Sequence, residues 1–93
     1  MARKKKAGRP MEKSIHTREY KVVLQLLKEA REAADLTQVE LAEKLGQSQS
    51  FVSKAEVGER RLDVIQLRTI LGVLGVSLAD FVRRLEHELE GSG

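Results

Sequence analysis

Residues 38–57 read QVELAEKLGQSQSFVSKAEV, and this stretch decides the fold. Its first part places apolar side chains on one helical face, and Gly46 follows as a residue that readily takes the left-handed conformation in which helices end. Ser48 then offers an N-cap for a second short segment that runs to about residue 56. The apolar side chains that would point from both segments into one shared core are Leu41, Leu45, Val52 and Ala55. The stretch therefore predicts two short helices joined by a tight turn.

Two short helices separated by a three-residue turn that contains glycine form a helix-turn-helix. Thr37 and Glu40 occupy capping-box positions at its start, where the threonine hydroxyl accepts from the Glu40 amide and the glutamate reaches back to the cap. Ala42 is small enough to let the two helices approach closely. Each feature is common alone, and it is their joint spacing that predicts the motif.

Further helices are predicted on both sides of the motif. Apolar residues at steps of three and four predict a helix capped by Thr17, with Asp35 leaving it in a left-handed conformation. Asp63 and Ser77 cap two more helices, which Gly75 separates. The other positions expected to face the core are Tyr20, Val23, Leu27, Ala30, Ala34, Val39, Val64, Leu67, Ile70, Leu71, Leu74, Leu78, Phe81, Val82, Leu85 and Leu89. Five helices without a strand pattern predict an all-α five-helix bundle.

The positive charge is concentrated at the N-terminus. The chain of 93 residues has a net charge of +3, but residues 1–13 alone contribute +5, which leaves −2 for the rest. Charge blocks of this kind are typical of disordered segments. We expect a basic disordered arm at residues 1–16, the helix-turn-helix domain at residues 17–90 and a tail at residues 91–93.

Composition argues against several classes of function. The chain has no cysteine, which excludes disulfides and thiolate metal sites and is compatible with a reducing cytosol. Its only aromatic residues are Tyr20, Phe51 and Phe81, too few to favour stacking of single-stranded DNA or RNA bases. No apolar run approaches the roughly 18 residues that span a bilayer. His16 and His87 are isolated, and no phosphate loop or nucleophile–base pair is present, so we expect no catalytic residue, metal or cofactor.

The chain resembles the phage-repressor and Cro-type helix-turn-helix family, also called the XRE family. The matching segments are LTQVELAEKLG at 36–46, SQSFVSKAEVGERR at 48–61 and LGVSLADF at 74–81, and the resemblance extends over residues 20–81. It implies a lambda-repressor-like fold and a transcriptional regulator, a repressor, that reads double-stranded DNA in the major groove with helix 48–56. It also implies a cytoplasmic protein of bacterial or phage origin that associates with the nucleoid when bound to DNA.

The resemblance also assigns individual residues. Those implied to read base edges are Ser48, Gln49, Ser50, Ser53 and Lys54. Their types suit the task, since Gln49 can bond adenine N6 and N7 and Lys54 can donate to guanine O6 and N7. Gln38 is implied to hold a phosphate and brace the third helix, and Arg60 and Arg61 to grip the DNA backbone.

Arg31 and Glu56 are implied to form a partly buried structural ion pair. The sequence departs from the family pattern at a few positions. Asp35 replaces the usual glycine after the first helix, Ala55 is small where a larger apolar residue is typical, and Val57 removes a frequent polar phosphate contact. Gln47 replaces a common apolar turn residue. None of these changes is incompatible with the fold, but they leave the set of phosphate contacts open.

The basic arm has three interpretations. Gly8-Arg9-Pro10 resembles the core of an AT-hook that reads the minor groove, with Ala7 in place of the first arginine of the hook. The cationic side chains that would instead tether the arm to DNA phosphates are Lys4, Lys5, Lys6 and Arg9. The third interpretation is an inert solubilising tail. The sequence leaves all three open.

Two apolar surfaces raise the question of partners. The last helix has an apolar seam, and Val22, Leu26 and Ala33 give the first helix a second apolar strip. These surfaces either pack against each other within one chain or form the two-fold interface of a homodimer, which would set two recognition helices about 34 Å apart. The alternative function is a protein-interaction module, such as the antitoxin of a toxin–antitoxin pair or a restriction-modification controller.

Overall fold

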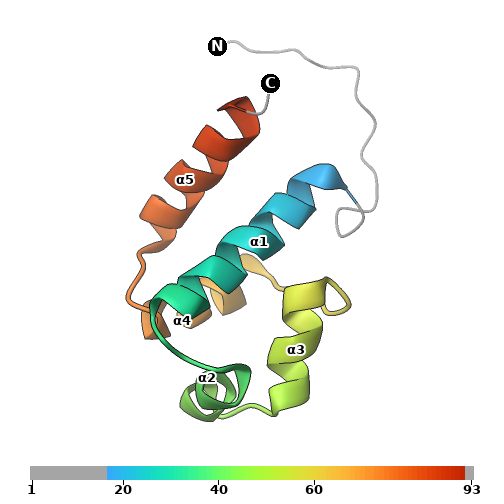
Figure 1. Ribbon diagram of the computed structural model, residues 1–93, viewed down its shortest axis with the longest axis vertical. Coiled ribbons are helices and arrows are strands. Elements are labelled where there is room, and N and C mark those ends of the chain that lie inside the picture. The colour runs from blue at the N-terminus through green and yellow to red at the C-terminus, as the bar shows by residue number, and fades with distance from the viewer. Residues whose placement is uncertain (1–16, 92–93) are drawn as a thin grey trace.

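The computed structural model describes residues 17–91, which form five helices and, within that range, no strand (Figure 1). The helices are α1 (Arg18–Ala33), α2 (Gln38–Leu45), α3 (Gln49–Val57), α4 (Val64–Val73) and α5 (Leu78–Gly91). This arrangement confirms the all-α fold with five helices, and each helix begins one residue after the predicted cap.

Each helix starts where a side chain satisfies its free backbone amides. The capping residues are Thr17, Thr37, Ser48, Asp63 and Ser77. Two of them belong to complete capping boxes: the Thr37 amide donates to Glu40 Oε1 at 2.8 Å, and the Asp63 amide donates to Gln66 Oε1 at 3.0 Å. An N-cap contributes about 1 kcal/mol. The short helices of this chain therefore have well-defined starts.

The connections between helices use residues with positive φ. Gly46 follows α2 with φ of 66° and Gly58 follows α3 with φ of 85°. Asp35 follows α1 with φ of 61°, which confirms the left-handed conformation predicted for it. Among the described residues it is the one residue other than glycine that has a positive φ. A side chain in this conformation is strained, because its Cβ approaches the carbonyl oxygen.

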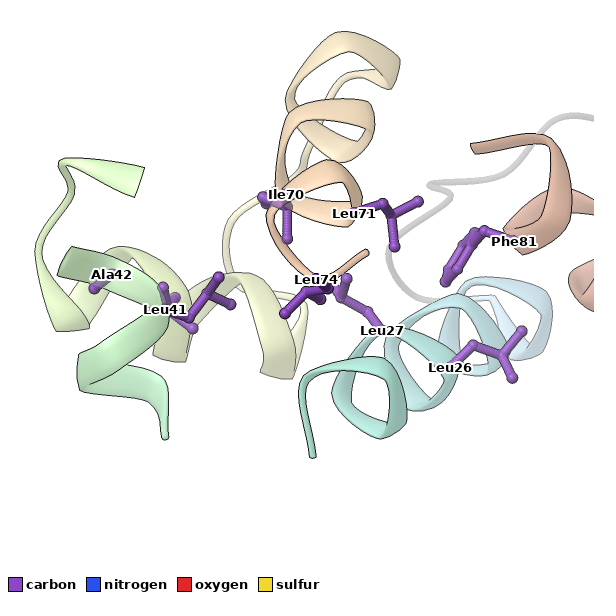
Figure 2. Packing of buried hydrophobic residues seen from close by; sticks show 9 residues of the cluster. Leu26, Leu27, Leu41, Ala42, Ile70, Leu71, Leu74 and Phe81 are labelled. Carbon is purple, nitrogen blue, oxygen red and sulfur yellow. The ribbon is translucent and has the colours of Figure 1, made fainter. Parts of the chain in front are cut away.

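The core joins all five helices. Its most buried side chains are Leu26, Leu27, Leu41, Ala42, Val52, Ala55, Ile70, Leu71, Leu74 and Phe81. Figure 2 shows Leu27 and Leu74 meeting in the middle of this core, with Leu41 on the α2 side and Phe81 on the α5 side. One continuous apolar layer therefore connects the helix-turn-helix to the α1–α5 end of the molecule.

Three residues predicted to face the core do not. Val39 and Val64 expose 50% and 59% of their surface, because each lies in the first turn of a short helix, beyond the reach of the core. Val82 exposes 43%, because it follows Phe81 directly and is rotated by about 100° to the edge of the apolar face. The prediction was wrong at these positions.

Helices α1 and α5 lie side by side and pack against each other (Figure 1). Leu26 of α1 and Phe81 of α5 expose only 5% and 4%, whereas Ala33, predicted to belong to the same apolar strip, is exposed. The buried seam of α5 is thus used within the chain, which is the first of the two predicted arrangements.

Among residues 17–91 no single helix is long and apolar enough to cross a membrane. Helices α4 and α5 meet that test only together, as a pair bent by 106°. Their apolar residues Ile70, Leu71 and Phe81 lie in the core.

Candidate nucleic-acid interface

Helices α2 and α3 form the predicted helix-turn-helix at one end of the molecule (Figure 1). The two helices pack against each other, and each buries a small residue that is 2% exposed, Ala42 on α2 and Ala55 on α3. In the turn, the Gly46 amide donates to the Glu43 carbonyl at 3.1 Å and the Gln47 amide donates to the Ala42 carbonyl at 2.9 Å. These bonds fix the direction in which α3 leaves α2.

The side chains predicted to read bases lie at the start of α3 and along it: Ser48, Gln49, Ser50, Ser53 and Lys54. All are exposed except Ser53, which is half-buried. Ser48 has a structural duty, because its hydroxyl accepts from the Phe51 amide at 3.2 Å, although its O–H remains able to donate. Ser50 and Lys54 make no side-chain hydrogen bond or ion pair with any other residue that the structure describes. Their polar groups therefore face solvent.

The exposed face of α3 has no negative charge. Glu56 is the only acidic residue of this helix, and it is 9% exposed and turned toward α1. Val57, the last residue of α3, exposes 63% of its surface, and Arg61 beyond the helix is exposed as well. A polyanion that approaches α3 from its outer side thus meets amide, hydroxyl and ammonium groups.

Arg31 and Glu56 form the ion pair that joins α1 to α3. Arg31 Nε lies 2.6 Å from Glu56 Oε2, and Arg31 Nη2 lies 3.1 Å from Glu56 Oε1. Arg31 Nη1 also donates to the Leu36 carbonyl at 2.8 Å. The hydrogen bonds with Glu56 raise the pKa of Arg31 above its ordinary value, and the opposing effect of desolvation is smaller. The arginine therefore stays charged wherever the protein is folded.

A chain of side-chain hydrogen bonds continues from this pair to the surface. Gln38 Nε2 donates to Glu56 Oε1 at 2.9 Å, and Gln49 Nε2 donates to Gln38 Oε1 at 2.9 Å. Gln38, the first residue of α2, thus braces α3 through contacts near both ends of that helix. We call Arg31, Glu56, Gln38 and Gln49 the amide relay.

The loop after α3 contains a contact that sequence reasoning missed. The guanidinium carbon of Arg60 lies 4.9 Å from the centre of the Phe51 ring, which is within cation–π range. Gly58 turns the chain back on α3 and brings these two residues together. No spacing rule connects them, so no sequence signal could have found the contact. It positions Arg60 beside the start of α3.

Several predicted residues lie outside the part of the chain that the structure describes. These are the cationic residues of the arm, Lys4, Lys5, Lys6 and Arg9. Among the described residues, no group of His, Cys, Asp or Glu side chains has the arrangement of a metal site.

Comparison with known proteins assigns the chain to a family. The model of the helix-turn-helix family matches residues 27–81. A solved structure, of an XRE-family like protein from Pseudomonas syringae pv. tomato str. DC3000, is 47% identical, with a TM-score of 0.74 over 81% of this chain and 92% of that one. No curated protein matches the chain.

The fold and the exposed α3 face define the class of helix-turn-helix DNA-binding regulators. Within this class, the chain belongs to the XRE family, which confirms the resemblance seen in its sequence. The family is a regulatory DNA-binding family and not a family of enzymes.

Proposed function

We propose that the protein is a sequence-specific repressor of transcription that reads the major groove of double-stranded DNA with α3. One observation carries this proposal: the exposed face of α3 presents Gln49, Ser50 and Lys54, while the only carboxylate of the helix is buried. Gln49 suits adenine and Lys54 suits guanine. Ser48 and Ser53 complete the proposed base-reading set.

Phosphate contacts would position this face. Gln38, Arg60 and Arg61 border α3, and the second N–H of the Gln38 amide is left over after its bond to Glu56. Contacts of this kind fix orientation and carry no sequence information, whereas base contacts specify sequence. The proposal therefore predicts an altered sequence preference for substitutions in the base-reading set, and weaker binding with an unchanged preference for substitutions of Arg60 and Arg61.

Selection of bound duplexes from a random library tests the proposal. We expect one enriched sequence for the wild-type chain, an altered sequence for Gln49→Ala, and the same sequence with weaker binding for Arg61→Ala. A Gln49→Ala variant that selects the wild-type sequence would show that α3 is not the reading surface. Transcription from a promoter that overlaps the selected site then tests repression, and increased transcript would contradict it.

The arm adds a separate proposal, that its cationic residues tether the protein to phosphates. Deleting residues 1–13 should flatten the dependence of log K on log salt by roughly 0.9 for each phosphate that the arm neutralises. The sequence selected from the random library should stay the same if the arm contacts phosphates, and should lose an A·T preference beside the site if it reads the minor groove. An unchanged salt slope would mean that the arm contributes nothing to binding.

We also propose that the protein binds DNA as a homodimer. Two copies would read two half-sites about one helical turn apart. Since the seam of α5 packs on α1, the large apolar side chains left exposed are the best candidates for contact, and Val64 and Ile65 of α4 expose 59% and 67%. Sedimentation of the Ile65→Glu variant at micromolar concentration tests the surface. A monomeric wild-type chain that binds a palindrome tightly would disprove the dimer.

A further inference from the structure

The donors and acceptors of the amide relay follow one order, which is set by the buried carboxylate of Glu56. Glu56 is paired with the Arg31 guanidinium and is 9% exposed. A carboxylate accepts hydrogen bonds and donates none. The end of the Gln38 side chain that meets Glu56 at 2.9 Å must therefore be its N–H group.

This constraint passes from one amide to the next. With its nitrogen turned to Glu56, Gln38 presents its carbonyl oxygen to Gln49. Gln49 must in turn donate, as the distance of 2.9 Å from its Nε2 to Gln38 Oε1 shows. What remains for a ligand is the carbonyl oxygen of Gln49 and its second N–H.

We propose that Glu56 is a positioning residue for base recognition, which acts through Gln38 to fix the amide of Gln49 in the orientation that selects adenine over guanine. This inference rests on the proposed major-groove function. Adenine offers an acceptor at N7 and a donor at N6, which match the remaining N–H and carbonyl oxygen of Gln49. Guanine offers two acceptors, N7 and O6, and its O6 would oppose the carbonyl oxygen of Gln49.

The Glu56→Gln variant tests the inference, because it keeps the shape of the side chain and removes the constraint. A glutamine at this position donates as well as accepts, so Gln38 can turn over and present its N–H group to Gln49. Gln49 would then accept from Gln38 and offer both N–H groups outward, which suits guanine. We expect the preference for adenine over guanine at one base pair to fall by about fivefold or more in competition binding.

Two controls separate this effect from loss of folding. Leu85→Ala weakens packing of α5 on the core without touching the relay, and should lower thermal stability while leaving the adenine preference unchanged. Gln38→Leu keeps the Arg31–Glu56 pair and breaks the relay at its middle, so it should lose adenine preference even if Glu56→Gln does not fold. If Gln38→Leu retained the full preference for adenine, the inference would be overturned.

A second measurement on the free protein does not depend on DNA. In nitrogen-15 NMR spectra, the side-chain amide protons of Gln38 and Gln49 should exchange with water more slowly than those of Gln47. In Glu56→Gln the Gln49 amide protons should lose this protection, because Gln49 then accepts from Gln38 and donates to no neighbour. Equal exchange in the wild-type chain would overturn the relay itself. A protected relay in a chain that selects no duplex sequence would instead overturn the proposed function. A protected relay whose loss leaves adenine preference unchanged would overturn the positioning role alone.

Discussion

Between α1 and α5 the chain buries leucine and phenylalanine and leaves its ion pairs at the surface, whereas between α1, α2 and α3 it buries an ion pair. Leu26 and Phe81 represent the first region, with Arg84 and Glu29 more than 40% exposed beside them. The second region buries Ala42 and Ala55 and contains the amide relay.

The difference follows from what each kind of interaction can specify. Burial of apolar area stabilises without direction, so it joins helices but leaves polar tips free to rotate. Hydrogen bonds weaken steeply when they are misaligned, so a connected series of them sets the orientation of its last member. The molecule has its directional contacts directly behind the proposed reading face. Substitutions in the two regions should therefore separate stability from specificity.

Phe81→Ala should have the largest effect on stability with no effect on specificity. The side chain is 4% exposed, and its loss leaves a cavity where α5 meets the core. We expect the free energy of unfolding to fall by about 3 to 5 kcal/mol. Urea unfolding measures the change, and duplex selection in the cold should return the wild-type sequence. A different sequence would show that α5 packing controls α3.

Arg31→Ala should cost about as much, roughly 3 to 5 kcal/mol, because it leaves Glu56 buried without its partner. Unlike Phe81→Ala, it should also weaken discrimination between bases. The double variant Arg31→Ala, Glu56→Ala serves as the control, because two neighbours that act together lose less jointly than the two single losses added. Additive losses in urea unfolding would mean that the pair has no coupling.

Lys54→Ala should reverse the pattern, with little change in stability and a clear change in binding. Its side chain is exposed and without a partner among the described residues, so unfolding should change by less than about 0.5 kcal/mol. Binding to the selected duplex should weaken by about 1 to 3 kcal/mol, with one base position relaxed. Arg83→Ala, which removes an equal charge from α5, should leave that position fully specified. Equal effects of both variants would indicate attraction by charge alone.

Local features of this fold could be read from the sequence, and contacts between distant segments could not. The caps at Thr37 and Asp63 depend only on neighbouring residues, and the left-handed conformation of Asp35 follows from its place after α1. The ion pair and the bracing role of Gln38 came from family resemblance. The contact of Arg60 with Phe51 depends on how the chain turns at Gly58, and the direction of the relay on how three helices meet. Neither of these two features follows from the spacing of residues along the sequence.

Arg84→Ala should have the smallest effect, although Arg84 joins α1 to α5. Its Nη2 lies 3.3 Å from Glu29 Oε1 and its Nε lies 3.6 Å from Glu88 Oε2, but the side chain is 57% exposed, so water and salt screen both contacts. We expect a loss of about 1 kcal/mol or less, which disappears in high salt. A double-mutant cycle with Glu29→Ala isolates the contact that crosses the two helices. A coupling energy above about 1.5 kcal/mol that survives high salt would mean that the α1–α5 contact also depends on directional polar interactions, and the contrast with the helix-turn-helix would no longer hold.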